Sequence, residues 1–287
     1  MIENTTHHSR PSGFLFMTVT AFLFALTALL VGFAARTVEP ELLVVSRYLV
    51  MFILLTVLRV SKVIAVQPVN RRLLMYRSLA AAFSGAFFFM ALATISIAEA
   101  TMLKFTYPVF AIAASALFFG EKTERIVLVT LAFTLAGVLF IVKPGSFHFQ
   151  AGYLWGLLNA LAAGISVGLV RRLRVTDNAW TIIYYWVFIG FFLTLPLLLT
   201  VTVWPDTSAW IIMIAASITG MAAQGTMLIG FRYAKTGTAC VIMTLEVALT
   251  TGAGVLFLGQ TPALSKIIGG CLIIAGSMIL FVREGRK

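Results

Sequence analysis

The chain has 287 residues, of which 61% are hydrophobic and 11% are charged, and its mean hydropathy is +1.03. A water-soluble domain cannot bury so much apolar surface, so the composition excludes a soluble globular protein and indicates that lipid is the solvent. The 21 lysines and arginines exceed the 10 acids and give a net charge of +11. We do not expect nucleic acid as a partner, because that would need a contiguous basic face with interleaved aromatic residues.

Apolar stretches long enough to cross a bilayer recur along the whole chain. A helix needs about 20 such residues to cross about 30 Å of hydrocarbon. We predict ten spans, at 14–34, 42–60, 78–96, 99–119, 126–142, 153–170, 180–203, 209–231, 238–258 and 264–282. Strict alternation of apolar and polar residues is absent, so the spans are helices and not barrel strands. The sequence therefore predicts one all-α integral membrane protein.

The two halves of the chain repeat one another. Residues 98–143 align with 237–282 at a constant offset of 139 without a gap, and the offset holds back to residue 13. The matched pairs include Gly13 with Gly152, Ala21 with Ala160, Phe52 with Phe191, Ser78 with Ser217, Gly120 with Gly259 and Gly137 with Gly276. Each half holds five predicted spans, an odd number, so the halves must insert in opposite orientations. We therefore expect two inverted five-helix repeats.

The positive charges predict how the chain is oriented. With the N-terminus in the cytoplasm, 16 lysines and arginines fall on the cytoplasmic side, 2 within spans and 3 outside. Positive residues favour the cytoplasmic side of membrane proteins, so both termini are predicted there and the loop from Pro144 to Gly152 outside. The predicted organisation is a cytoplasmic tail at 1–12, a first repeat at 13–143, a second repeat at 152–282 and a cytoplasmic tail at 283–287.

The sequence holds none of the usual signatures of enzymes or metal sites. The first span has an internal counterpart at 153–170, so we expect it to be retained and not cleaved as a signal peptide. Cys240 and Cys271 lie within predicted spans, and the three histidines have no metal-ligand spacing. No nucleotide-binding loop, nucleophile motif or catalytic pair of carboxylates is found. We therefore expect no catalytic residues, no cofactor and no metal.

Two short patterns resemble those of a known family. They are Thr106-Tyr107-Pro108, followed by an apolar run to Gly120-Glu121-Lys122, and Glu39-Pro40-Glu41, leading to Arg47-Tyr48. In these patterns the chain resembles the EamA family of the drug/metabolite transporter superfamily, over about residues 13–282. The resemblance implies a ten-helix inverted-repeat transporter of the bacterial inner membrane that moves amino acids, their derivatives, nucleoside-like compounds or drugs. The second half departs from the pattern, with Gln260 matching Glu121 and Val247 matching Pro108.

Glu246 is the residue that points most directly to a function. It lies about nine residues into the predicted span 238–258, where an ionised carboxylate on an isolated helix costs at least ~2.5 kcal/mol. Such a carboxylate needs a compensating group. Three interpretations stay open: an acid in a wet cavity that binds a cationic group or a proton, a structural ion pair that locks two helices, and a neutral, protonated side chain that is buried without a role.

Lys104 is the expected partner of Glu246. At the repeat offset, Glu246 corresponds to Tyr107, which lies one turn from Lys104. Pro108 cannot donate a hydrogen bond to the carbonyl of residue 104, so we predict a hinge at Pro108. A free carbonyl beside an ammonium suits a carboxylate ligand. Lys104 also lies close enough to the outer end of its span for its ammonium to reach the interface instead.

Other polar residues within or beside the spans complete the candidate set. Asn159 is a polar group within a span, and Gln224, in a stretch of small residues, either bonds across a helix interface or lines the cavity. Arg47 is expected to reach the outer interface or to pair with Glu39 or Glu41. Glu99 begins its span at the outer surface, where we expect it to be solvated. The predicted substrate-binding residues are Glu246, Lys104, Tyr107, Gln224, Asn159 and Arg47, with Pro108 as the hinge.

An acid and a base near the middle of the membrane can bracket the ammonium and carboxylate of one substrate. We therefore expect a secondary transporter, an exporter or an uptake carrier, of a small amino-acid-like, zwitterionic or cationic metabolite, acting by alternating access around a central cavity. Proton coupling and uniport are both compatible with the sequence. The alternative is a subunit that translocates lipids or lipid-linked sugars, which needs no central acid. The expected partners are the substrate and membrane lipid, and the chain is a monomer or a homodimer.

Overall fold

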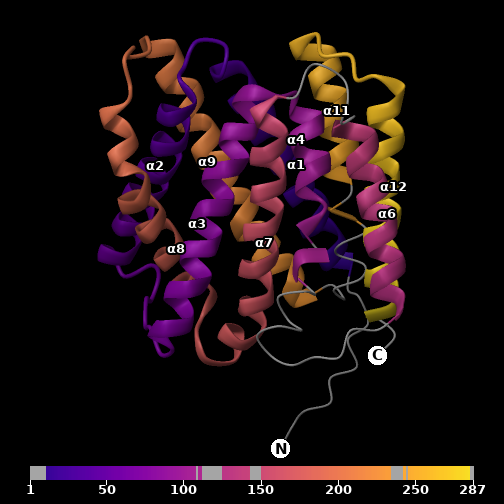
Figure 1. Cartoon of the computed structure of the whole chain (residues 1–287). Coiled ribbons are helices and arrows are strands. Elements are labelled where there is room, and N and C mark those ends of the chain that lie inside the picture. Colours follow the sequence, from indigo (N-terminus) through magenta and orange to yellow (C-terminus); the bar gives the residue numbers. More distant parts are fainter. Residues whose placement is uncertain are drawn as a thin grey trace, which may run out of the picture.

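The computed structural model describes residues 11–107, 109–111, 125–142, 150–233, 242–243 and 245–284. These residues form a bundle of roughly parallel and antiparallel helices, with no strand among them (Figure 1). The helices are α1 Pro11–Ala34, α2 Pro40–Val60, α3 Arg71–Thr94, α4 Ile97–Lys104, α6 Arg125–Val142, α7 Ala151–Thr176, α8 Ala179–Thr194, the 3₁₀ helix η1 Leu195–Leu199, α9 Thr207–Tyr233, α11 Leu245–Leu258 and α12 Leu264–Glu284. The predicted all-α fold is confirmed.

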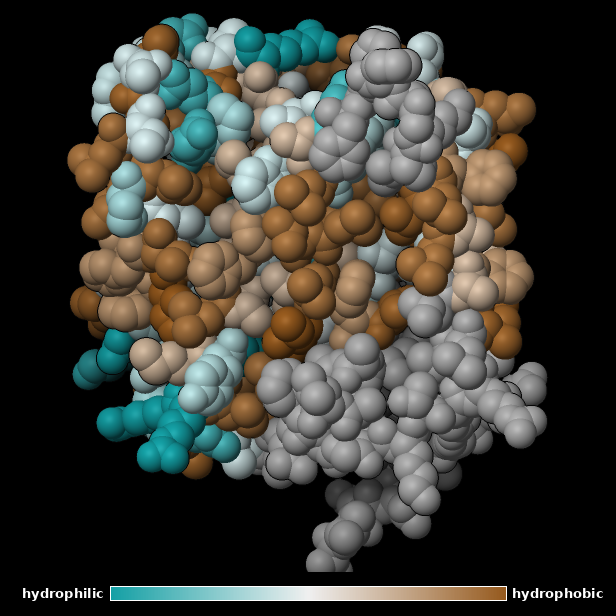
Figure 2. Space-filling view, in the orientation of Figure 1, coloured by the Kyte–Doolittle hydropathy of each residue, from teal (hydrophilic) through white to brown (hydrophobic). Residues whose placement is uncertain are grey.

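Six of the described helical segments are long and apolar enough to cross a membrane. They are Gly13–Ala34, Pro40–Val60, Arg71–Thr94, Ala151–Val170, Ala179–Leu199 and Thr207–Met227. Shorter apolar helices cover Ala132–Ile141, Leu245–Leu258 and Leu264–Gly276. On the face that Figure 2 shows, hydrophobic side chains form a broad band across the middle and hydrophilic ones gather toward the ends. The predicted spans 99–119 and 238–258 fall partly outside the described residues, so ten spans stay a prediction.

The starts of several helices are set by local signals that the sequence contains. Pro40 stands at the first position of α2, where its fixed φ suits a helix and its missing N–H is not needed. The side chains of Asn70 and Asn178 accept hydrogen bonds from the backbone amides of Leu73 and Thr181 and so cap α3 and α8. The starts of α2 and α8 differ by the repeat offset of 139, as do those of α6 and α12. The repeat therefore extends to the helix boundaries.

The packing of the helices follows the duplication. α1 packs along α9 and α3 packs along α7, and these are two copies of one contact, because α1 corresponds to α7 and α3 to α9. α2 packs on its counterpart α8, and α6 on its counterpart α12. The rings of Phe52 and Phe191, which match each other in the repeat, stack with centroids 4.9 Å and planes 3° apart. A pseudo-two-fold axis therefore passes between these two rings.

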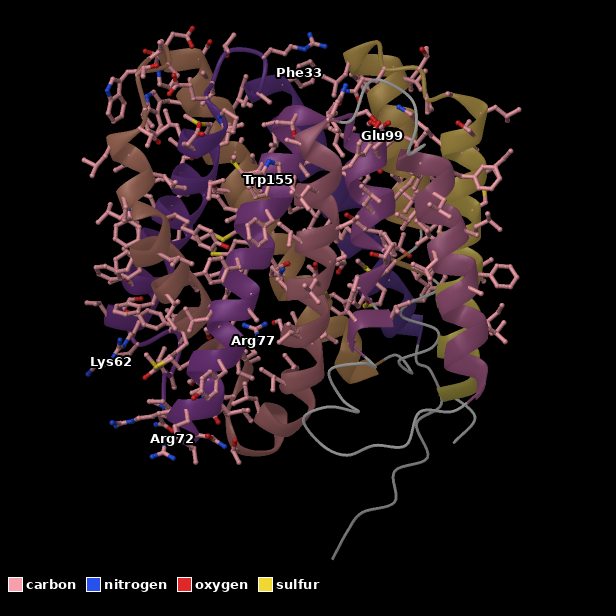
Figure 3. The ribbon with its side chains drawn as sticks, in the orientation of Figure 1. Phe33, Lys62, Arg72, Arg77, Glu99 and Trp155 are labelled. Atoms are coloured by element: carbon pink, nitrogen blue, oxygen red, sulfur yellow. The ribbon has the colours of Figure 1, made fainter. Side chains whose placement is uncertain are left out.

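The corresponding helices α1 and α7 run in opposite directions. Gly32, near the end of α1, faces Ile97, and Gly152, at the start of α7, faces Ile95. The end of one helix and the start of its counterpart therefore lie at the same end of the bundle, as the labels on Phe33 and Trp155 show in Figure 3. The repeats are inverted. This end, which is the outer one in the predicted orientation and which we call the outer end, carries Glu99, whereas Lys62 and Arg72 lie at the opposite end.

One contact at the outer end fastens the first repeat to the second. The carboxylate of Glu39 accepts hydrogen bonds from the hydroxyl and the backbone amide of Thr202. These bonds lower the pKa of Glu39, and the bond from the hydroxyl has the larger effect. The pKa of Glu39 is therefore lower in the folded protein than in the unfolded chain. The contact stabilises the fold at pH values above the unfolded-state pKa, and this stabilisation is lost as the pH falls through the folded-state pKa.

The pair α6 and α12 crosses at a point where only glycine fits. A Cβ atom built on Gly137 would lie 2.5 Å from the carbonyl oxygen of Gly269, and one on Gly269 would lie 2.6 Å from that of Gly137. The two backbones therefore touch, as in other close helix pairs of membrane proteins.

We predict that Gly137→Ala destabilises the protein by about 1–3 kcal/mol, because the added methyl group must push the two backbones apart. Gly225→Ala is the matched control, since a Cβ there meets no atom within 4 Å. Thermal unfolding in detergent measures both. Equal melting temperatures for the two variants would show that the crossing does not matter for stability.

The orientation gives a second prediction. In a chain with Cys240 and Cys271 replaced by serine, Ser146→Cys in the loop predicted to be external should react with an impermeant maleimide in intact cells. Ser61→Cys, beside Lys62 at the opposite end, should react only after permeabilisation. The reverse pattern would reject the orientation.

Candidate functional site

The centre of the candidate site is an ion pair between the two repeats. Lys104 is the last residue of α4 and Glu246 lies in the first turn of α11. The Lys104 Nζ lies 2.6 Å and 2.9 Å from the two carboxylate oxygens of Glu246. Only 1% of the Glu246 side chain is exposed, against 20% of that of Lys104. The compensating group that Glu246 requires is therefore Lys104, and the pair is open on the ammonium side.

Aromatic rings surround the ammonium of Lys104. Its Nζ lies 4.5 Å from the ring centroid of Phe24 on α1, 5.2 Å from that of Phe88 on α3 and 5.8 Å from that of Phe105. The face of an aromatic ring attracts a cation, by roughly 0.5–2 kcal/mol. These rings stabilise the charge without giving it a second carboxylate. Sequence reasoning missed Phe24 and Phe88, because nothing distinguishes them among 24 phenylalanines.

Arg47 does not lie where the sequence analysis placed it. We expected its side chain to reach the outer interface or to pair with Glu39 or Glu41. Instead Arg47 is 6% exposed, and its guanidinium lies 4.4 Å from the ring centroid of Phe89 and 5.8 Å from that of Trp186. Residues 42–48 of α2 are all buried, so this turn faces the neighbouring helices and carries Arg47 into the bundle. That expectation was wrong, and Glu39 binds Thr202 instead.

The remaining candidate residues lie at different places. Asn159, on α7, is buried and its Nδ2 donates to the carbonyl and the hydroxyl of Ser84 at 2.7 Å and 3.0 Å. It therefore bonds across the interface between α7 and α3. Gln224 is half-buried on α9, and Tyr107 is half-buried just beyond α4. Pro108, the predicted hinge, lies outside the described residues.

The expectation that Glu99 is solvated was also wrong. Glu99 is only 3% exposed. Its side chain forms a capping box with Ser96, and its carboxylate forms an ion pair with Lys266 of α12. The hydroxyl of Tyr153, on α7, donates a hydrogen bond to it at 3.1 Å. The capping box turns the carboxylate back over its own helix, and α7 and α12 cover it. Ser-x-x-Glu is a known capping signature, so the sequence did contain a signal for this arrangement.

Known proteins place the chain in a transporter family. A model of the EamA-like transporter family matches residues 11–143 and again 150–282. The chain is 29% identical over 272 residues to the pseudopaline exporter CntI of Pseudomonas aeruginosa, covering 94% of this chain and 95% of that one. It is 20% identical over 292 residues to human solute carrier family 35 member G1, covering 95% and 79%.

A solved crystal structure shares the fold. It superimposes with a TM-score of 0.65 over 97% of this chain and 99% of that one, at 21% identity. Together with the two matched repeats, this agreement covers almost the whole sequence. The chain therefore belongs to the EamA-like transporter family, which is part of the drug/metabolite transporter superfamily.

Proposed function

We propose that this protein is a secondary transporter that exports a small, amino-acid-like zwitterion from the cytoplasm by alternating access of its two repeats. The observation that carries the proposal is the buried ion pair between Lys104 and Glu246, which links α4 of the first repeat to α11 of the second. Ligand sites of transporters built from inverted repeats lie at the interface between the repeats.

The pair leaves neither of its two charges buried and unpaired. Removing one partner of a buried pair costs about 3–5 kcal/mol, because the other charge is then left without compensation. In the ion pair each partner compensates the other at 2.6 Å. The site is therefore neutral, and a movement that separates the repeats would leave each charge alone in the apolar interior unless a ligand replaces the lost partner.

A zwitterion can open the pair without changing the charge balance. Its carboxylate would bind the ammonium of Lys104, and its ammonium would bind the carboxylate of Glu246. A ligand with only one of these groups would leave one protein charge unpaired, at the same cost of several kcal/mol. The site therefore favours ligands that carry both groups. The alternative, translocation of lipids or lipid-linked sugars, gives this pair no role.

The direction of transport rests on the relatives. The chain spans nearly the whole length of a relative that is named an exporter. With both termini in the cytoplasm, the outer end of the bundle is the exit. Pseudopaline is a suitable first test compound.

Binding gives the first test of this proposal. Purified protein is screened by thermal shift against pseudopaline and the twenty common amino acids, because a ligand that binds the folded state raises its melting temperature. Each amino acid that binds is then compared with its amide, which lacks the carboxylate, and with its deaminated acid, which lacks the ammonium. We expect stabilisation only by the parent zwitterion. Equal stabilisation by all three compounds would contradict the proposed recognition.

Substitution of the pair gives the second test. Glu246→Gln and Lys104→Met should each lower stability by about 3–5 kcal/mol and abolish transport in proteoliposomes. The double variant removes both charges, so it should regain most of the stability but no transport. Glu41→Gln removes a different acid, in the first turn of α2, and serves as the control. Normal transport by Glu246→Gln, or by the double variant, would exclude the pair as the binding site.

A further inference from the structure

A polar cavity lies at the outer end of the bundle, away from the ion pair of Lys104 and Glu246. It has a volume of about 420 Å³, within the range of small-molecule sites. Its walls come from both repeats, since it lies between the outer ends of α1, α3 and α4 and those of α11 and α12. Its polar lining includes Arg36, Thr94, Ser96, Glu99, Gln260 and Lys266.

The charges around this outer cavity do not balance. Among the residues that the structure describes, it is lined by two cations, Arg36 and Lys266, and by one acid, Glu99. Glu99 is fully engaged, because it accepts from Tyr153, pairs with Lys266 and caps α4. The two cations keep unused hydrogen-bond capacity. The Lys266 side chain is 29% exposed, and the exposed Arg36 uses one nitrogen for the carbonyl of Leu258 at 3.1 Å, although a guanidinium carries five N–H donors.

Helix α4 connects the outer cavity to the central ion pair. Glu99 stands near its start and Lys104 at its end, five residues later, which is about 7.5 Å along a helix axis at 1.5 Å per residue. Two ion pairs thus join this short helix to the second repeat. In one, α4 supplies the acid, Glu99, to Lys266, and in the other it supplies the base, Lys104, to Glu246. The outer cavity and the central pair are therefore close together along one helix.

We propose that the outer cavity is a second ligand site, which binds the carboxylate of a small zwitterion or anion through Lys266 and Arg36. Its role as an exit site rests on the proposed function, but its preference for anions does not. A carboxylate released by Lys104 would be received by Lys266 and Arg36, while Tyr153 and the α4 capping box hold Glu99 in place. The excess of one positive charge makes the cavity repel cations.

Cysteine chemistry measures the charge preference without transport and without an identified ligand. Thr94→Cys is introduced into a chain with Cys240 and Cys271 replaced by serine, because Thr94 is exposed and lines the cavity. The purified protein in detergent is treated with two methanethiosulfonate reagents, one bearing a sulfonate and one a trimethylammonium group. The ratio of the two rates reports the local potential. Trp204→Cys, 62% exposed in the loop before α9, is the control position.

Removal of a cation should change this ratio at Thr94→Cys alone. We expect Arg36→Gln to lower the ratio of sulfonate to trimethylammonium rates roughly 25-fold, because one charge at about 4 Å in water changes each rate about fivefold and the two rates change in opposite directions. The ratio at Trp204→Cys should stay the same. Lys266→Gln should act in the same direction, but it unpairs Glu99, so the exposed Arg36 gives the decisive variant.

A ligand probe completes the test. Sodium glutamate should slow labelling of Thr94→Cys, and this protection should be lost in Arg36→Gln, whereas lysine hydrochloride at the same concentration should not protect. An unchanged ratio in Arg36→Gln, or equal protection by glutamate and lysine, would overturn the outer site. Neither readout depends on Lys104 or Glu246. A failure of the outer site therefore leaves the central site untouched, and the central site is tested separately by Glu246→Gln and Lys104→Met.

Discussion

The structure depends on one electrostatic constraint, which is that a carboxylate inside an apolar bundle needs a counter-charge. Glu246 meets it with an ammonium from the other repeat, and aromatic faces from α1 and α3 complete the surroundings of that ammonium. The contact is therefore both an electrostatic pair and a joint between the halves. Any movement that separates the repeats must break it or replace it, and a zwitterionic ligand is a replacement that keeps the charge balanced.

The inverted duplication explains why such a joint exists. Matched helices pack on each other or exchange partners, and the matched rings of Phe52 and Phe191 stack across the pseudo-axis. The chemistry, however, is asymmetric. Lys104 corresponds to Met243 and Glu246 to Tyr107, so each repeat supplies one charge and the pair forms only when the two halves are assembled. The backbone keeps the symmetry, whereas the polar side chains have diverged from it.

The sequence predicted the fold well and the surroundings of the charges less well. Membrane helices were predictable because long apolar stretches in lipid have few alternatives, and the repeat register indicated Lys104 as the partner of Glu246. Arg47 and Glu99 were misplaced, because their depth was judged from one helix at a time. Their burial is decided by α3, α7, α8 and α12, which lie far from them in the sequence. The rings around Lys104 carry no signal of their own in a chain this rich in phenylalanine.

Solid-state NMR in lipid tests the central claim most directly, by measuring the dipolar coupling between lysine ¹⁵Nζ and glutamate ¹³Cδ in the protein without ligand. Lys104→Met and Lys266→Met assign the signal to the central pair or to the outer one. We predict strong coupling in a Lys266→Met protein, where the pair of Lys104 and Glu246 remains, and its loss when Lys104→Met is added. Coupling that is absent in Lys266→Met, or that persists after Lys104→Met is added, would contradict a central ion pair between the repeats.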